Sequence, residues 1–209
     1  MNERHVTFRS GDLTLEGLIY VPAGNAAAPA AVVCHPHPAY GGSMDNNVVE
    51  AILDAMWQLG YATLRFNFRG VGASEGAYGG GEGEGDDAAA AVGFLTRQSG
   101  VSAAGAVLAG YSFGAMVALV TGLRMAEVAR VVAVALPVSM TPSAVAAAPK
   151  PVLLVSGDRD SYSPVAGLRS LTKGLGKSAR LEIVPGADHF FGGFEAALSG
   201  AIVAALGGR

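Results

Sequence analysis

Cysteine is almost absent from this sequence, because Cys34 is the only one in 209 residues. A single cysteine excludes an internal disulfide and a thiolate-rich metal site, and it fits a reducing compartment. Charge of either sign is also scarce, with 14 Lys and Arg against 17 Asp and Glu and a net charge of -3. No stripe of Lys and Arg is present, so nothing favours a nucleic acid as partner.

Long apolar runs are missing as well. No stretch reaches the ~18 uninterrupted apolar residues of a membrane span. The first ten residues, MNERHVTFRS, are polar and contain none of the apolar core of a secretory signal. We therefore expect a soluble, cytoplasmic protein with no membrane partner.

The sequence does contain enough apolar material for one sizeable core. Hydrophobic residues make up 51% of the chain and charged residues 15%, which is a globular composition. No repeat and no interdomain linker is visible, so we expect a single domain over residues 1–209. The glycine-rich stretch GAYGGGEGEG, residues 76–85, predicts a short flexible loop.

Short apolar runs alternate with helical patterns along the chain. Residues 13–22 alternate apolar and polar side chains, which predicts a half-exposed antiparallel strand. Runs without alternation predict strands buried on both faces at 30–34, 61–68, 105–110, 131–138 and 151–157, with one more strand at 180–186. Helices are expected to begin at Asp45, Asp86 and Ser163-Pro164. This alternation predicts an α/β fold with a mostly parallel sheet of about seven to eight strands flanked by helices.

The pattern G-x-S-x-G, which marks a nucleophile elbow, occurs twice. GYSFG surrounds Ser112 and GASEG surrounds Ser74. An elbow needs a strand that runs into a tight turn and a helix that starts at the serine. The apolar runs AVLAG and AMVALVTGL flank Ser112, whereas glycines rather than a helix follow Ser74. We therefore predict Ser112 as a nucleophile; the alternative is a serine that only caps a helix.

A serine nucleophile needs a base, and the base needs a carboxylate that orients it. His189 follows the predicted strand at 180–186, and Asp158 and Asp160 follow the one at 151–157. The chain order is then the Ser…Asp…His order of hydrolases. Asp158 lies nearer the strand end, so it stays open as an alternative to Asp160.

The other histidines are weaker candidates for the base. His5 lies near the N-terminus, and His35 and His37 follow the first parallel strand in the segment CHPHP. Two histidines at this spacing suggest a metal, but no carboxylate or cysteine cluster accompanies them. We expect no metal and no cofactor, and a structural or oxyanion-loop role for the pair.

Together these segments resemble the α/β-hydrolase superfamily from about residue 5 to the end. They are most similar to small cap-less bacterial hydrolases of the dienelactone-hydrolase-like branch. The segments that carry the resemblance are VVCHPHPAYGGSMDNNVV, RFNFRGVGASEG, GYSFGA, LLVSGDRDSYSP and GADHFF. The resemblance favours Asp160 as the acid and assigns GASEG to a glycine-rich loop whose serine is not the nucleophile. Dienelactone hydrolases have cysteine where this chain has Ser112, which argues against a dienelactone substrate.

The resemblance also implies an oxyanion hole, in which two N–H groups bind the negative oxygen of the reaction intermediate. One donor is the backbone N–H of Phe113, the residue after the nucleophile. The usual His-Gly of the other donor loop is His35-Pro36 here, and proline has no N–H. The second donor is therefore assigned to His37, with Tyr40 as the alternative.

The connection between the predicted strands at 131–138 and 151–157 is too short for a helical cap. We therefore expect an open site walled by loop side chains, which are Tyr40, Tyr111, Met140, Tyr162 and Phe190 or Phe191. The expected function is hydrolysis of small, short-acyl carboxylic esters through an acyl-enzyme, by a monomer or homodimer. A lactonase, dienelactone-type or peptidase-like hydrolase is an alternative on the same residues, and a non-catalytic binding protein is an alternative of another class.

Overall fold

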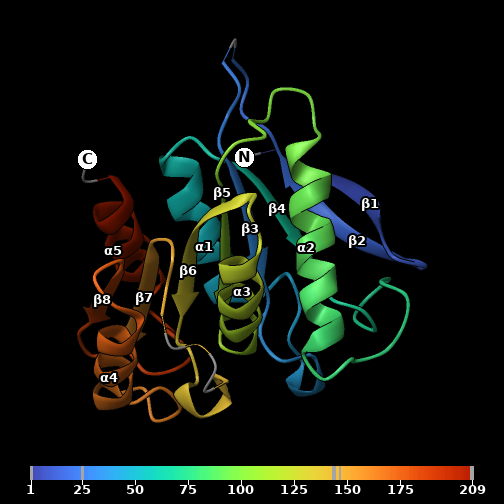
Figure 1. Ribbon diagram of the computed structural model, residues 1–209. Coiled ribbons are helices and arrows are strands. Elements are labelled where there is room, and N and C mark those ends of the chain that lie inside the picture. Colours follow the sequence, from blue (N-terminus) through green and yellow to red (C-terminus); the bar gives the residue numbers. More distant parts are fainter. Residues whose placement is uncertain (1, 25, 143–144, 146, 208–209) are drawn as a thin grey trace.

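The computed structural model describes residues 2–24, 26–142, 145 and 147–207, and one eight-stranded sheet forms its centre (Figure 1). The strands lie in the order β1-β2-β4-β3-β5-β6-β7-β8. Their bounds are β1 Arg4–Ser10, β2 Leu13–Tyr20, β3 Ala30–Cys34, β4 Ala62–Phe66, β5 Ala106–Tyr111, β6 Val128–Val134, β7 Val152–Gly157 and β8 Ala179–Val184. The pairs β1–β2 and β2–β4 are antiparallel and all other pairs are parallel. The predicted α/β class and mostly parallel sheet are confirmed.

The burial of the strands follows their apolar runs. Every residue of β3, β4, β5 and β7 is buried, as expected of strands covered by helices on both faces. The strand β1 was not predicted from the sequence, because its residues RHVTFRS are mostly polar. Only Phe8 and Ser10 of β1 are buried, and the strand is held by pairing with β2 along its whole length. Its structure depends on a partner strand more than on its own composition.

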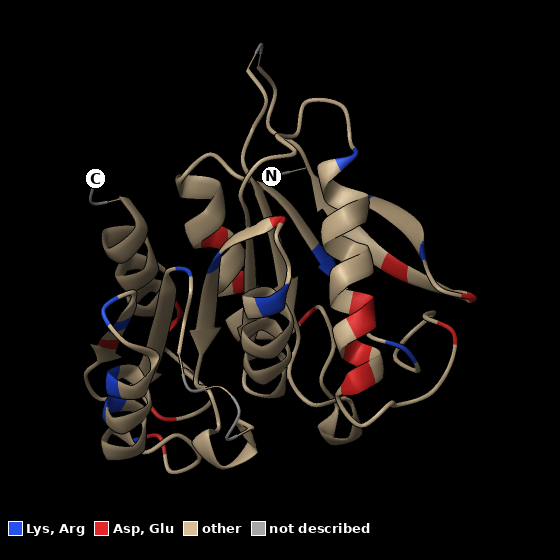
Figure 2. Cartoon of the chain, viewed as in Figure 1, with Lys and Arg blue, Asp and Glu red and all other residues tan. Residues whose placement is uncertain are grey.

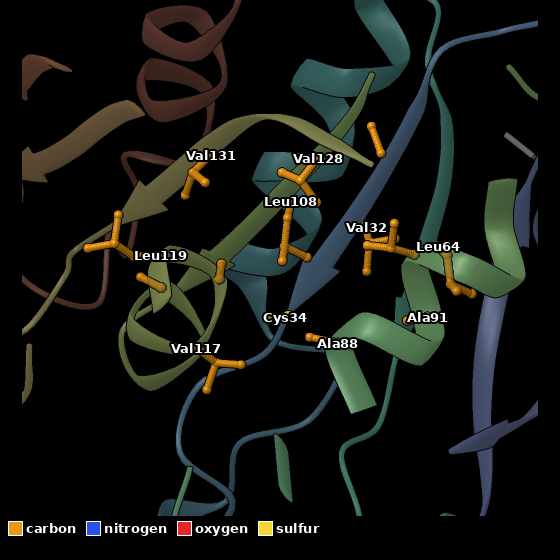
Figure 3. Packing of buried hydrophobic residues seen from close by; sticks show 14 of the residues in the cluster. Val32, Cys34, Leu64, Ala88, Ala91, Leu108, Val117, Leu119, Val128 and Val131 are labelled. Atoms are coloured by element: carbon orange, nitrogen blue, oxygen red, sulfur yellow. The ribbon is translucent and has the colours of Figure 1, made fainter. Parts of the chain in front are cut away.

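Within the described residues, five α-helices cover the two faces of the sheet. Their bounds are α1 Asn47–Gln58, α2 Glu82–Thr96, α3 Phe113–Arg124, α4 Val165–Leu175 and α5 Glu195–Gly207. Helices α1 and α5 pack with one face of the sheet, and α2, α3 and α4 pack with the other. Figure 3 shows the second of these layers, in which Leu108 of β5 and Val32 of β3 face side chains from α2 and α3.

The glycine-rich stretch before α2 differs from the predicted flexible loop. Helix α2 begins at Glu82, four residues before the expected start at Asp86. The carboxylate of Glu84 is fully buried and accepts hydrogen bonds from the N–H groups of Gly79 and Gly81 at 2.8 and 2.7 Å. The buried carboxylate of Asp87 accepts a hydrogen bond from the guanidinium of Arg69, with Nη2 2.7 Å from Oδ1. Figure 2 shows these acidic residues gathered in the first turns of α2, where the positive end of the helix favours them.

The carboxyl ends of the parallel strands share one edge of the sheet, the lower edge in Figure 1. Strand β6 ends there earlier than predicted, because Ala135 adopts a positive φ of 48° and turns the chain. Among its described residues, the connection from β6 to β7 contains one short 3-10 helix, η2 Val138–Met140. A second one, η1 Pro38–Tyr40, follows β3. The expected absence of a cap thus leaves this edge open.

Candidate active site

Ser112 lies at a sharp turn between β5 and α3. Its φ of 54° and ψ of -117° place a non-glycine residue in a strained conformation that is typical of functional sites. The turn needs a glycine on either side, because a Cβ at Gly110 would collide with the carbonyl of Gly114, and one at Gly114 with the carbonyl oxygens of Cys34 and His35. The two glycines of GYSFG are therefore required by close backbone approach, and the serine between them is half-buried at the strand edge.

Ser74 has a different environment. Its side chain is 7% exposed, donates a hydrogen bond to the carbonyl of Asn67 at 2.7 Å and accepts one from the N–H of Glu16 at 3.1 Å. The bond with Glu16 ties the loop after β4 to β2, and the bond with Asn67 closes the loop on itself. The structure gives Ser74 a role in holding this loop, and no base contacts its hydroxyl within the described residues.

His189 and Asp160 meet Ser112 from the loops after β8 and β7. The Nε2 atom of His189 lies 3.0 Å from Oγ of Ser112, and its Nδ1 lies 2.9 Å from Oδ2 of Asp160. Since a neutral imidazole has one N–H, the hydrogen bond from Nδ1–H to the carboxylate of Asp160 keeps that proton on Nδ1 and leaves Nε2 free to accept from the serine. The three predicted residues thus form one continuous hydrogen-bonded chain.

The surroundings of Asp160 keep its carboxylate ionised. Burial by itself would raise its pKa, but the hydrogen bond and charge interaction with His189 outweigh burial and lower the pKa below its usual value. The backbone N–H groups of Tyr162 and Ser163 add to this by donating to Oδ1 at 2.8 and 2.9 Å. Asp158 is exposed and accepts instead from the N–H of Gly186 at 2.7 Å, so it makes a turn contact and no hydrogen bond with His189.

Tyr111 differs from its expected place in the wall of the site. Its side chain is only 3% exposed, and its hydroxyl donates to the carbonyl of His189 at 3.0 Å. Burial raises the pKa of this phenol, so the group stays a donor. Tyr111 therefore supports the loop that holds His189 and offers almost no surface to a substrate.

The two histidines of CHPHP have separate roles. His35 is fully buried, with Nδ1 2.6 Å from the carbonyl of Pro36 and Nε2 accepting from the N–H of Phe68 at 3.1 Å. Both ring nitrogens are engaged, so His35 is structural. His37 accepts the N–H of Ala39 at Nδ1, and its ring lies 4.8 Å from that of Phe113. No group of three His, Cys, Asp or Glu within the described ranges is arranged to hold a metal.

The first predicted oxyanion donor lies at the N-terminus of α3. Phe113 is the first residue of α3, and the first N–H groups of a helix have no partner within the helix. The positive end of the helix dipole adds to the attraction for a negative oxygen at this point. His37 borders the same place through its ring contact with Phe113, and its own carbonyl is committed to the N–H groups of Tyr40 and Gly42.

Four of the six predicted wall residues are exposed. Tyr40 is 88% exposed, Tyr162 and Phe190 are each 60% exposed, and Met140 is 42% exposed. Phe191, by contrast, is fully buried in the core beneath α1 and α5, so Phe190 is the member of the pair that faces solvent.

Tyr78 was not predicted from the sequence; it is 45% exposed, and its ring lies 4.9 Å from the ring of His37 and 5.8 Å from that of Phe113. A tyrosine within a glycine-rich stretch was the only signal for it in the sequence.

Two hollows of the described surface do not include the residues of the proposed triad. They measure about 530 and 400 Å³ and lie beside α4 and β8 and beside the β1–β2 turn, and neither is lined by Ser112, Asp160 or His189. None of the helices in the described part of the chain has the length and apolar character of a membrane span.

The fold and the site define the class of this protein as an α/β hydrolase without a cap. Solved structures agree: an α/β serine hydrolase homologue from Coxiella burnetii is 33% identical, with a TM-score of 0.89 over 99% of this chain and 98% of its own. An α/β serine hydrolase without a lid from Xanthomonas campestris is 30% identical, with a TM-score of 0.84 over 97% of this chain and 92% of its own. An uncharacterized protein from Rickettsia prowazekii is 35% identical over 89% of this chain and 81% of its own length.

A family profile described as X-Pro dipeptidyl-peptidase (S15 family) matches residues 11–162, a span that includes Ser112 and Asp160 and ends before His189. The chain therefore belongs to this family, whose members are α/β hydrolases, and it is a hydrolase of the serine class.

Proposed function

We propose that the protein is a carboxylesterase that cleaves small, short-acyl esters with Ser112, His189 and Asp160 as a catalytic triad. The observation that carries the proposal is the hydrogen-bonded chain from Ser112 through His189 to Asp160, with steps of 3.0 and 2.9 Å. A serine at a strained turn gains nothing structural from this arrangement. This series of hydrogen bonds is what a base-activated nucleophile requires.

The proposed reaction has two halves. His189 Nε2 accepts the proton of Ser112 as the hydroxyl oxygen attacks the acyl carbonyl, and the backbone N–H groups of Phe113 and His37 stabilise the oxyanion. His189 then gives the proton to the departing alkoxide, which leaves an acyl-serine. Water, activated by the same imidazole, releases the acid. Asp160 stays ionised throughout and stabilises the imidazolium.

An ester is favoured over an amide because of the openness of the site. Amide cleavage needs more transition-state stabilisation, and enzymes draw much of it from binding parts of the substrate remote from the reacting bond. The exposed loops around Ser112 offer little enclosed surface for such binding. A small ester, which reacts more readily, places fewer demands on this surface.

The test is active-site labelling combined with hydrolysis of a substrate panel. A fluorophosphonate probe should label the wild-type protein at Ser112 and fail to label Ser112→Ala. p-Nitrophenyl acetate, a lactone and an alanyl-prolyl anilide should then be compared by kcat/KM, and we expect the acetate to be the best substrate. A protein that binds small esters without labelling or turnover would instead be a non-catalytic member of the fold.

A peptidase-like activity is the second candidate, because the matching family is described as X-Pro dipeptidyl-peptidase. A dipeptidyl-peptidase must recognise the free amino terminus of its substrate, and this recognition needs a carboxylate near the serine. Asp188 is exposed next to His189, but one of its oxygens already accepts the N–H of Phe190 at 2.9 Å. A kcat/KM for the alanyl-prolyl anilide above that for the acetate would establish this candidate over the esterase.

A further inference from the structure

The exposed large apolar side chains of the described chain all lie on loops at the same edge of the sheet. They number five, and each lies on a loop or short 3-10 helix that follows a parallel-strand carboxyl end: Tyr40, Tyr78, Met140, Tyr162 and Phe190. Single exposed apolar residues are ordinary, but a gathering of them marks a binding surface. Four of the five, Tyr40, Tyr78, Tyr162 and Phe190, are aromatic, and each lies beside His37 or His189; they are called the aromatic rim here.

Two members of the rim stand beside His189 in particular. The ring of Tyr162 lies 4.7 Å from the imidazole between centroids, and the ring of Phe190 lies 5.5 Å from it at nearly a right angle. The two rings are 6.4 Å apart. Each is 60% exposed, so most of its surface is still available to a further group.

Backbone hydrogen bonds fix the turns that carry both rings. The N–H of Tyr162 donates to Asp160, and the N–H of Phe190 donates to Asp188 at 2.9 Å. Both residues therefore start from turns that are fixed by a neighbouring carboxylate. A preorganised aromatic surface loses little conformational freedom when a ligand binds to it.

The position of the departing oxygen determines which part of an ester contacts the rings of Tyr162 and Phe190. In the proposed mechanism His189 Nε2 protonates the departing oxygen, so that oxygen must come within hydrogen-bond distance of the imidazole. The alcohol part of the ester, which is attached to this oxygen, therefore begins beside Tyr162 and Phe190. Tyr40, Tyr78 and Phe113 surround His37 instead, with ring separations from His37 of 4.8 to 4.9 Å, on the side expected to bind the oxyanion.

We propose that Tyr162 and Phe190 form a leaving-group subsite that selects esters of aromatic alcohols. This inference rests on the proposed esterase function. An aromatic ring in the alcohol can stack on one ring and meet the edge of the other, a geometry that strengthens contact beyond the apolar area buried. A saturated ring of similar size buries similar area but lacks this extra term, so the subsite distinguishes the two.

The test compares benzyl acetate with cyclohexylmethyl acetate. The two esters share the acyl group and a primary alcohol of similar size, and they differ in the aromaticity of the ring. We expect a kcat/KM ratio of about two- to tenfold in favour of benzyl acetate, the range that one aromatic pair provides. The ratio should fall towards one in Tyr162→Ala and in Phe190→Ala, and Tyr162→Phe, which keeps the ring, should retain it.

The ratio is the correct measure because any damage to His189 affects both esters equally. Tyr40→Ala, which removes the most exposed ring on the opposite side, is the matched control and should leave the ratio at its wild-type value. A wild-type ratio near one would overturn the subsite, as would a ratio that survives both alanine variants or falls equally in Tyr40→Ala. Absence of any Ser112-dependent hydrolysis of either acetate would overturn the proposed function itself, and the subsite with it.

Discussion

Two serines occupy G-x-S-x-G segments, and their surroundings set opposite expectations for mutation. Ser112→Ala removes the proposed nucleophile and should reduce kcat by about 10⁴-fold or more with p-nitrophenyl acetate. Ser74→Ala should keep most of the activity, because Ser74 contacts only the backbone of Glu16 and Asn67. It should instead lower the free energy of unfolding by about 1–3 kcal/mol, the usual effect of leaving buried partners unsatisfied.

These outcomes are measured by steady-state kinetics and urea unfolding of the same preparations. The assignment fails if mass spectrometry maps a fluorophosphonate adduct to Ser74.

Mutation of Asp160 and mutation of Asp158 are predicted to have very different effects on kcat. Asp160→Asn should reduce kcat by orders of magnitude, since asparagine cannot stabilise the imidazolium and can hold the wrong tautomer of His189. Asp158→Asn alters an exposed turn in which one oxygen accepts the N–H of Gly186, and the amide oxygen can still accept it. Its kcat should stay within a few-fold of wild type. The reverse order of the two kcat values would transfer the acid role to Asp158.

At the scale of elements, the absence of a cap sets the acyl-chain preference. The described part of the connection between β6 and β7 contains only the short helix η2, so nothing there covers the Ser112 turn. Each added CH₂ of an acyl chain contributes ~0.8 kcal/mol only when it is buried. We expect kcat/KM for p-nitrophenyl esters to be greatest between acetate and about hexanoate, without activation at a lipid interface. A maximum at dodecanoate or longer would reveal a buried acyl tunnel.

At the scale of the whole molecule, His35 makes stability depend on pH. Burial lowers the pKa of His35 from 6.5 to about 4, against a smaller opposing effect of its hydrogen bond to Pro36. Between these two pH values the unfolded chain binds more protons than the folded one, so the free energy of unfolding falls as the pH is lowered. The loss should amount to about 3 kcal/mol over that interval. The pKa of Asp160 is also lowered in the fold, so its protonation at acidic pH likewise lowers the free energy of unfolding.

The measurement is urea unfolding at several pH values for wild type and His35→Gln. Glutamine does not titrate, and its carbonyl can still accept the N–H of Phe68. The variant should therefore be less dependent on pH than wild type between pH 6.5 and 4, whatever its stability at neutral pH. Parallel curves for the two proteins would assign the acid loss to other groups.

Local signals in the sequence predicted the sheet except for β1, and they predicted Ser112 and His189 but left Asp158 and Asp160 both open as the acid. Strands buried on both faces leave apolar runs, and a strained turn of close backbone approach requires glycine at Gly110 and Gly114. His189 could be placed because it directly follows a predicted strand, and the carboxyl ends of parallel strands meet at one edge.

Other features depended on partners distant in sequence, and only the tertiary structure decided them. β1 is polar and exists as a strand through its pairing with β2, and α2 starts early because buried Glu84 accepts N–H groups from the preceding loop. The sequence left open whether Phe190 or Phe191 faces the site, and in the fold Phe191 is buried in the core while Phe190 faces solvent. Tyr111, expected in the wall, is buried and hydrogen-bonded to His189. Neighbours in a loop share the same local sequence, so which of them is buried is decided by how the chain turns against packed elements, and that direction is a property of the whole fold.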